Sequence, residues 1–379
     1  MAPPMAPVIA IDAMGGDSAP GPEVEGAVAA ARERRARVIL LGEESRLRAE
    51  LQRLGATHLD IAVRHCSEVI TMHDHPGQAA RKKRQSSMRI GFELVRSGEA
   101  QAIVSAGNSG AMLACGLFVL GRMRGLDRPG IAVTMPTLEP GLFGAAPRVS
   151  ECVLLDTGAN VDVKPQTLAQ FAVLGATFAK LRSTSQRLRP RVGLLSNGEE
   201  ASKGTPLLRE THALLSRSPS SAFEYVGYVE GRDLFQFRRP AGLALREGGL
   251  DVVVTDGFTG NVVLKTAEGA GRFLADLLKS EVKRSLLAQL GALLMMPALQ
   301  SLRRVVDVEA RGGAPLLGVN GVAIICHGRS SARAIARAIA VAEDHVQSGL
   351  IEATKAAVEA HRFADSSAST DPEDQPTGG

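Results

Sequence analysis

Residues 252–269 read VVVTDGFTGNVVLKTAEG and combine a strand, a turn and a helix start. The opening valines are a β-branched run that suits a strand buried on both faces. A polar turn with two glycines follows, and from Asn261 the apolar spacing becomes helical. Free backbone N–H groups at such a turn suit an oxyanion or a phosphate, although an ordinary βα turn is the alternative. Asn261 and Lys265 are four residues apart and are expected on one side of the helix.

The same device recurs along the chain, with a short apolar run followed by glycine and Asp, Asn, Ser or His. The predicted strands are 8–11, 37–41, 59–63, 102–104, 153–155, 192–195, 223–229, 252–254 and 324–326. Helical segments alternate with them, the final one extending to about residue 361. This alternation predicts an α/β fold, a Rossmann-like mainly parallel sheet with helices on both faces. Ligands bind such sheets at the carboxyl ends of the strands, so six polar turns are expected to form one cleft.

These turns supply the candidate residues for binding a substrate or a phosphate. They are Asp12, Gly15, Gly16, Asp17, Ser105, Gly107, Asn108, Ser109, Gly110, Asp156, Asn160, Asn197, Glu199, Asp256, Gly257, Gly260 and Asn320.

Composition places the chain among ordinary globular proteins. Its 379 residues are 45% hydrophobic and 22% charged, which is compatible with one domain over residues 8–363 between disordered tails at 1–7 and 364–379. A net charge of +4 is too modest to imply nucleic acid, and the absence of Trp argues against stacking platforms for bases.

The four scattered cysteines predict buried thiols in a reducing cytoplasm. No metal-ligand spacing is found, and the pair His73 and His75 suits a structural or solvated role, so no metal is expected. Residues 1–7 lack the features of a signal peptide, and no apolar run reaches the roughly 20 residues that span a bilayer.

One segment departs from the alternating pattern. Residues 280–306 predict an apolar helical hairpin, with leucines at helical spacing in 286–294 and basic residues on both sides. The hairpin is too short to span a membrane. Contact with a bilayer interface, packing at a dimer contact and a purely local role all remain open.

Motifs of several enzyme classes are missing from the sequence. The first strand is not followed by GxGxxG, and neither GxxxxGK[ST] nor GxSxG occurs. No cysteine lies in an electropositive turn that would make it a nucleophile. These absences favour a reaction in which the substrate brings its own nucleophile, while the protein supplies position and charge stabilisation.

Six blocks of sequence carry a resemblance to a known family. They are IAIDAMGGDSAPGPEVEGA, ARKKRQSSMRIGFELVRSGEAQAIVSAGNSGA, VLLDTGANVDVKP, GLLSNGEEASKGTP, DVVVTDGFTGNVVLKTAEG and GGAPLLGVNGVAIICHGRS. Through them the chain resembles, over roughly residues 8–360, the bacterial phosphate acyltransferases of phospholipid synthesis, the PlsX-type acyl-[acyl-carrier-protein]:phosphate acyltransferases. Ser109 stands where the family usually has threonine, and SNGEE at 196–200 also departs from the usual motif. The hydroxyl and both glutamates are kept.

The resemblance implies an enzyme that moves an acyl chain from acyl carrier protein onto inorganic phosphate, giving acyl phosphate for a membrane glycerol-3-phosphate acyltransferase. It implies a three-layer α/β/α sandwich similar to phosphotransacetylases and isopropylmalate dehydrogenases, assembled as a homodimer without cofactor. A cytoplasmic enzyme associated peripherally with the membrane is expected. The rival functions are a coenzyme A-dependent phosphotransacetylase, a decarboxylating dehydrogenase, and a non-catalytic regulator that binds the carrier or the membrane.

The chemistry assigns a role to four candidate catalytic residues, Asn261, Lys265, His327 and Lys203. Lys203, Lys265 and the turn 108–110 are expected to bind phosphate. Asn261 and the N–H group of Gly260 would hold the thioester oxygen, and His327 would protonate the departing sulfur or orient phosphate. The aspartates are expected to brace turns, because carboxylates repel phosphate.

A basic surface is expected to steer the acidic carrier protein. It comprises the cations Arg32, Arg34, Arg35, Arg37, Arg81, Lys82, Lys83 and Arg84.

Overall fold

The computed structural model describes residues 6–33, 36–139, 148–182, 189–218, 220–235, 249–306 and 311–361. Within these ranges eleven strands form one sheet in the order β3-β2-β1-β4-β11-β10-β5-β6-β9-β7-β8. The strands are β1 Val8–Asp12, β2 Arg37–Gly42, β3 Ile61–His65, β4 Ala102–Ser105, β5 Gly130–Glu139, β6 Arg148–Leu155, β7 Arg191–Leu195, β8 Glu224–Val229, β9 Val252–Val254, β10 Ala314–Leu317 and β11 Val322–Ile325.

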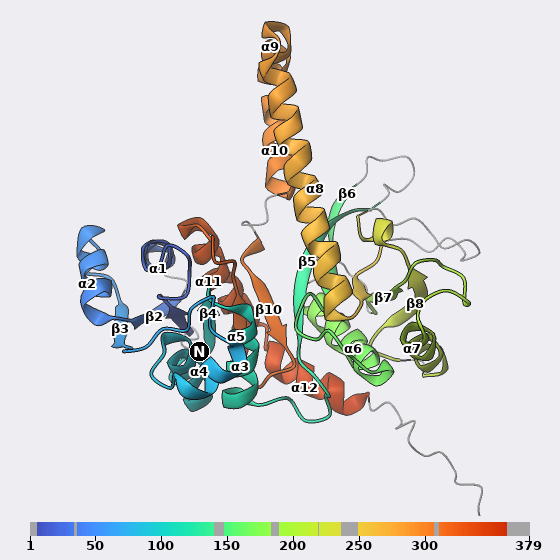
Figure 1. The fold of residues 1–379 in the computed structure, drawn as a ribbon, viewed down its shortest axis with the longest axis horizontal. Helices are drawn as coiled ribbons and strands as arrows, with labels where there is room; N and C mark the ends of the chain where they lie inside the picture. Colours follow the sequence, from blue (N-terminus) through green and yellow to red (C-terminus); the bar gives the residue numbers. More distant parts are fainter. Residues whose placement is uncertain are drawn as a thin grey trace, which may run out of the picture.

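Helices cover both faces of the sheet, which confirms the predicted α/β fold (Figure 1). On one face are α1 Gly21–Arg32, α2 Glu44–Arg53, α6 Pro165–Arg182, α7 Pro206–Arg217, α11 Ala332–Gln347 and α12 Leu350–Ala360. On the other are α3 Pro76–Lys82, α4 Ser87–Ser97, α5 Ser109–Cys115 and α8 Gly257–Lys283. Alternate side chains of β9 point to opposite faces of the sheet. Val252 and Val254 pack with α6, whereas Val253 packs with α8.

The strand directions divide the sheet into two parallel groups. Strands β1, β2, β3, β4 and β11 are parallel, and so are β6, β7, β8 and β9. Three antiparallel pairings separate the groups, β11 with β10, β10 with β5, and β5 with β6. Three reversals leave the two groups antiparallel to each other. The expectation that six strand ends meet at one edge is therefore wrong, because their carboxyl ends point to opposite edges.

Helix α8 connects the two edges. It is 27 residues long, begins at the carboxyl end of β9, runs back along the sheet and continues beyond it (Figure 1). The short helices α9 Leu286–Leu294 and α10 Met296–Val306 then fold back, so the predicted hairpin is the far end of a longer projection. A helix rises about 1.5 Å per residue, so side chains two to three turns along α8 lie well away from its start.

Other expectations need smaller corrections. Strands β5 and β10 were not predicted, and the strand expected at 59–63 is observed at 61–65. The predicted final helix is two helices, because Gly349 adopts a left-handed conformation with φ +66° between α11 and α12. The tails expected at 1–7 and 364–379 lie outside the described residues except for Ala6 and Pro7. The Pro7 carbonyl accepts a hydrogen bond from Arg37 N–H at 3.0 Å.

Candidate active site

The turn after β1 is built around a buried carboxylate. Asp12 Oδ1 accepts a hydrogen bond from Ser87 Oγ at 2.6 Å, and its Oδ2 accepts one from Ser105 Oγ at 2.7 Å. Burial raises the pKa of Asp12, while these hydrogen bonds act in the opposite direction. A Cβ on Gly15 would lie 2.6 Å from Asp12 Oδ2 and 2.8 Å from Gly107 N, so the turn requires glycine there. Asp12 therefore braces the turn, as expected.

The turns after β1, β4 and β11 contact one another. Asp17 N–H donates to Gly328 O at 2.7 Å, and a Cβ on Gly328 would meet both Asp17 and Met72. Asn108, which follows β4, donates its Nδ2 to three carbonyl oxygens of the loop 71–74 at 3.2 to 3.4 Å. Residues 12–17, 105–110 and 326–330 thus form one group, here called the first turn cluster.

The side chain of Asn108 is held by other groups of the protein. Its Nδ2 is committed to the loop 71–74, and its Oδ1 accepts a hydrogen bond from Ala111 N–H at 3.1 Å as the N-cap of α5. Both ends of the amide are therefore occupied by protein groups. Asn108 holds this loop against the first turn cluster, and its side chain has little capacity left to bind phosphate.

Helix α8 brings Lys265 to this cluster. The Lys265 Nζ atom lies 3.0 Å from Glu268 Oε2, and Glu268 Oε1 lies 3.5 Å from Nε2 of His327. The side chains of Lys265 and His327 are 49% and 59% exposed, whereas that of Glu268 is 12% exposed. Two of the four predicted catalytic residues thus lie on either side of one carboxylate, although they are 62 positions apart in the sequence.

Residues 156–160 and 256–261, here called the second turn cluster, lie at the start of α8. Asp156 accepts hydrogen bonds at 2.8 to 3.2 Å from the N–H groups of Ile131, Gly158, Ala159 and Asn160, and one from Asn160 Nδ2 at 2.9 Å. Burial raises its pKa against these bonds. Asp156 is therefore a brace for its own turn.

Several N–H groups that the sequence predicts for an anion at the first turn of α8 have partners within the protein. Asp256 Oδ1 accepts the Thr259 N–H at 2.8 Å, and the Gly257 N–H donates to Asn160 O at 2.7 Å. The Gly260 N–H, expected to hold the thioester oxygen, donates to Asp256 O at 2.9 Å. A Cβ on Gly260 would collide with the backbone oxygen of Asp156. The N–H groups of Gly257, Thr259 and Gly260 are thus already engaged by acceptors of the protein.

Asn261 lies on the same helix as Lys265, whereas Lys203 lies on a different turn. Asn261 is exposed, beside Gly158, and one helical turn before Lys265. Lys203 is exposed on a turn after β7, where Asn197 Oδ1 accepts the Gly204 N–H at 2.9 Å. That turn belongs to the edge opposite His327, since β7 and β11 run in opposite directions. The structure therefore does not join Lys203 to the first turn cluster.

Two further candidates have structural contacts. Glu199, on the same turn as Lys203, lies 3.9 Å from Arg232. Asn320 donates its Nδ2 to the carbonyl oxygens of Leu120, Gly121 and Arg122 at 3.2 to 3.3 Å. Because the turn 318–321 joins β10 to β11, Asn320 lies at the amino end of β11, whereas His327 follows its carboxyl end. Asn320 is therefore separate from the first turn cluster.

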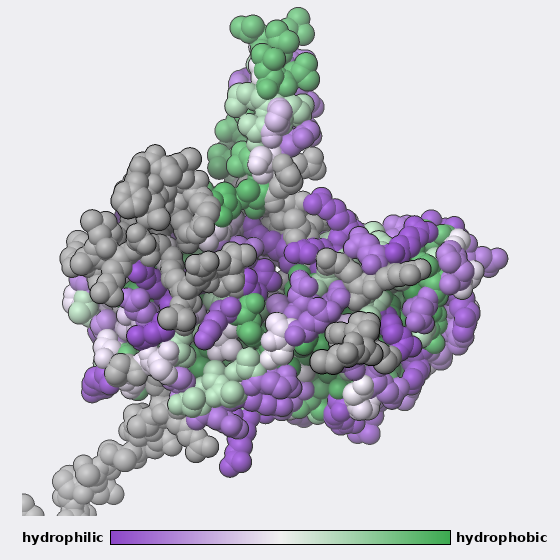
Figure 2. Space-filling view, turned by 180° about the vertical axis from the view of Figure 1, so that it is seen from behind, coloured by the Kyte–Doolittle hydropathy of each residue, from purple (hydrophilic) through white to green (hydrophobic). Residues whose placement is uncertain are grey.

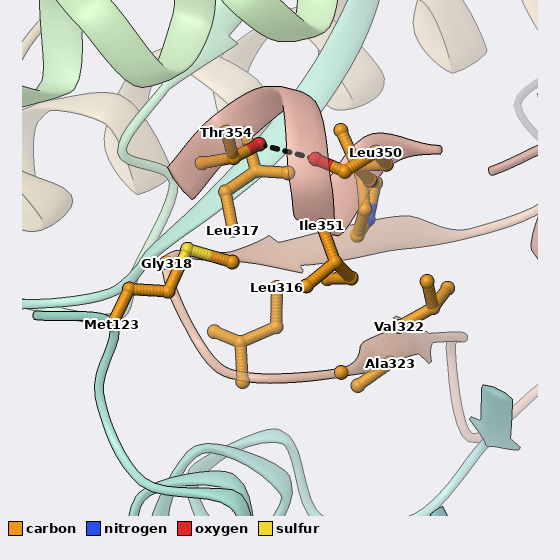
Figure 3. A pocket seen from close by; sticks show the side chains of 11 residues that line it. Met123, Leu316, Leu317, Gly318, Val322, Ala323, Leu350, Ile351 and Thr354 are labelled. Atoms are coloured by element: carbon orange, nitrogen blue, oxygen red, sulfur yellow. Dashed lines mark hydrogen bonds between the residues drawn. The ribbon is translucent and has the colours of Figure 1, made fainter. Parts of the chain in front are cut away.

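A small apolar cavity lies between β10, β11 and α12 (Figure 3). Met123, Leu316 and Ile351 are among its lining residues, and the Thr354 hydroxyl beside it donates to Leu350 O at 2.6 Å. Its volume of about 10 Å³ is that of a single water molecule. This cavity is too small for a substrate.

The cysteines are buried, as predicted. Burial raises the pKa values of Cys115 and Cys326 to about 12 and also raises that of Cys152. Since the thiolate is the reactive form, Cys326 is unsuited to act as a nucleophile although it precedes His327.

Sequence reasoning missed three residues of this region, Ser87, Glu23 and Glu268. Ser87 and Glu23 contact the turn after β1 from α4 and α1, and only the tertiary structure brings them there. Glu268 had a local signal, because it lies three residues after Lys265 in a helical stretch and therefore shares its face.

Comparisons with known proteins agree with this fold. A family model described as a fatty acid synthesis protein matches residues 8–353. The curated phosphate acyltransferase of Syntrophotalea carbinolica is 50% identical over 339 residues, 89% of this chain and 90% of the relative. That of Geobacter sulfurreducens is 48% identical over 342 residues, 90% of this chain and 91% of the relative.

Solved structures share the fold at low sequence identity. A phosphotransacetylase from Streptococcus pyogenes superposes with a TM-score of 0.55 at 18% identity, covering 93% of this chain and 94% of its own. The EutD phosphotransacetylase from Staphylococcus aureus has a TM-score of 0.54 at 16% identity, with the same coverage. The phosphotransacetylase-like α/β architecture is thus confirmed. With a family model matched over nearly its whole described length, the chain belongs to the fatty acid synthesis protein family.

Proposed function

We propose that the chain is a phosphate acyltransferase, which converts an acyl thioester of acyl carrier protein and inorganic phosphate into acyl phosphate and the free carrier thiol. The observation that carries this proposal is the identity of about half of all aligned positions with curated phosphate acyltransferases over nine tenths of the chain. The site agrees with it, because Lys265 and His327 present cationic and hydrogen-bonding groups beside turns rich in glycine.

The reaction asks little of a base. A phosphate oxygen attacks the thioester carbonyl carbon, a tetrahedral oxyanion forms, and the carbon–sulfur bond then breaks. The leaving thiol has an ordinary pKa of about 8.5, so its thiolate departs readily. The protein must hold phosphate against its hydration and stabilise the oxyanion, and we assign phosphate to Lys265 and the thioester oxygen to Asn261. His327 supplies the proton to the sulfur or orients phosphate.

Thiol release from palmitoyl-carrier protein, measured with and without phosphate, tests the proposal. Release that requires phosphate supports it, and release at the same rate without phosphate contradicts it. Lys265→Ala should lower kcat by about 100-fold to 1,000-fold, the range for removing one charge-stabilising group. Lys279→Ala is the matched control, because Lys279 is an exposed lysine of the same helix beyond the site.

A coenzyme A-dependent phosphotransacetylase is the second candidate, and the fold likeness to the S. pyogenes enzyme favours it. The identity of that pair is only 18%, against 50% for the phosphate acyltransferase of S. carbinolica. Thiol release from acyl-coenzyme A and from the acyl carrier protein, compared in the same assay, distinguishes the two functions.

The acidic carrier is proposed to approach the cations at and just after the carboxyl end of α3. Arg81, Lys82 and Arg84 are exposed, and the Arg81 guanidinium lies over the Phe118 ring at 4.7 Å. Lys83 differs from its neighbours, because its Nζ atom contacts Asp74 at 2.6 Å and lowers the pKa of that carboxyl to about 2. Of the second predicted group, Arg37 pairs with Asp60 at 3.2 Å, while Arg34 and Arg35 lie outside the described residues.

The projection of α8, α9 and α10 is proposed to contact a membrane surface, where the acyl phosphate would be consumed by the glycerol-3-phosphate acyltransferase. Apolar residues gather at its far end (Figure 2). Leu286, Leu287 and Leu294 are each more than three-quarters exposed. Among the described helices, none is both long enough and apolar enough to cross a bilayer. The competing proposal is that this end packs against a second copy in a homodimer.

A further inference from the structure

The contact between Glu268 and His327 joins two distant parts of the chain. Glu268 lies on α8, three turns from its start, and His327 lies on the turn after β11. The Oε1 atom of Glu268 is 3.5 Å from His327 Nε2, and its Oε2 atom is 3.0 Å from Lys265 Nζ. Each carboxylate oxygen therefore faces a proposed catalytic side chain, Oε2 that of Lys265 and Oε1 that of His327.

Burial sets Glu268 apart from ordinary surface glutamates. Its side chain is only 12% exposed, and its Oε1 atom is buried without a hydrogen-bond partner among the described residues. A buried carboxylate oxygen left unpaired is costly, so a donor is needed at this position. The Nε2 atom of His327 lies 3.5 Å from this oxygen, and catalytic hydrogen bonds are often this long before substrate is bound.

We propose that Glu268 is a positioning residue, which holds His327 through Nε2 and thereby leaves Nδ1 as the nitrogen that works on the substrate. The inference rests on the proposed function for the identity of that substrate. A neutral imidazole carries its single proton on one nitrogen, and the hydrogen bond of that nitrogen selects the tautomer. Glu268 accepts from Nε2–H, so Nδ1 carries the lone pair in the neutral ring and gains a proton only in the imidazolium. Its second oxygen holds Lys265 beside the same ring.

Spectroscopy of the full chain tests the tautomer without any turnover. The chain has 8 histidines, and the ¹⁵N signals of His327 are assigned by their loss in His327→Asn. In the neutral ring, the Nε2–H tautomer should predominate in the native protein. In Glu268→Ala the ring should exist as a mixture of its two tautomers. The ¹⁵N chemical shifts of Nδ1 and Nε2 should therefore move toward each other. Unchanged shifts in Glu268→Ala would overturn the inference.

Glu281→Ala is the matched control for this substitution. Glu281 lies on the same helix and pairs with Arg284 at 2.8 Å, also three residues later, but it is half-exposed and far along the projection. Glu281→Ala also removes a glutamate carboxylate from an ion pair on this helix, but Glu281 does not contact His327. Its His327 signals and its kcat should match those of the native chain.

Kinetics provide the second readout. Glu268→Ala should lower kcat by about 10-fold to 100-fold, the range for a carboxylate that orients a histidine, with a smaller change in KM for the acyl carrier. The amide of asparagine lies at the position of Nδ1, whereas the amide of glutamine reaches the position of Nε2. If Nδ1 works on the substrate, His327→Asn should therefore keep more activity than His327→Gln. The reverse order would overturn the inference. Thiol release that is independent of phosphate in the native enzyme would instead contradict the proposed function, while the ¹⁵N signals still decide the role of Glu268.

Discussion

Replacement of Glu23 by glutamine should stabilise the protein above neutral pH. Glu23 is 2% exposed on α1 and packs against Gly16, and its Oε2 atom has no hydrogen-bond partner among the described residues. Desolvation by burial, with a smaller contribution from the Asp12 carboxyl, raises its pKa from 4.5 to about 7. The folded protein therefore keeps a proton on Glu23 at pH values where an unfolded chain has lost it.

The sign of the effect follows from this proton. Between about pH 4.5 and pH 7 the folded state binds more protons at Glu23, so stability falls as the pH rises through that window. Above pH 7 the ionised Glu23 lowers the free energy of unfolding by about 3 kcal/mol, since each unit of pKa shift corresponds to about 1.4 kcal/mol. Glutamine keeps the shape of the side chain but carries no charge. For a chain of 379 residues, an unfolding entropy of about 2.1 cal/mol/K per residue converts this cost into about 4 °C.

Thermal unfolding of Glu23→Gln and the native chain, measured from pH 4.5 to pH 8.5, is the assay. The difference in Tm should be close to zero at the acid end and should grow to about 4 °C at the alkaline end. Glu25→Gln is the control, because Glu25 lies on the same helix but is partly exposed and paired with Arg53 at 2.9 Å. A difference in Tm for Glu23→Gln that is the same at every pH would refute the reasoning.

The remaining predictions concern packing, steering and the projection. Gly260→Ala should destabilise the fold by about 1 to 3 kcal/mol through overpacking. Gly269 on the same helix has open space around it, so Gly269→Ala should stabilise the fold by up to about 1 kcal/mol. Equal effects of the two substitutions in chemical denaturation would contradict this prediction. Arg84→Glu, or added salt, should raise KM for the acyl carrier but not for phosphate, and a flat salt response would argue against steering. Leu290→Glu should reduce flotation with anionic vesicles, and unchanged flotation would favour the dimer interpretation. Asn320→Ala should lower Tm and leave kcat unchanged. A large loss of kcat would instead indicate that Asn320 belongs to the active site.

Local sequence determined much of the architecture. The valine run 252–254 is buried on both faces of the sheet, and the polar turns that follow β1, β4, β6 and β9 occur where the pattern placed them. These features depend on neighbouring residues, because strand burial and turn geometry follow from side-chain branching, glycine and short polar groups. The prediction that the aspartates brace their turns also follows from local chemistry, since Asp12 and Asp156 lie beside backbone N–H groups of their own turns.

The tertiary structure alone decided which turns meet. Strands β5 and β10 reverse the direction of the sheet, and their pairing depends on partners far apart in the chain, such as Leu316 with Ile131. Lys203 and His327 were consequently placed at opposite edges. Lys265 comes near His327 because α8 begins at one edge of the sheet and runs back along it to the opposite edge. The contact that joins them is made by Glu268, whose proximity to His327 depends on long-range packing that no local pattern records.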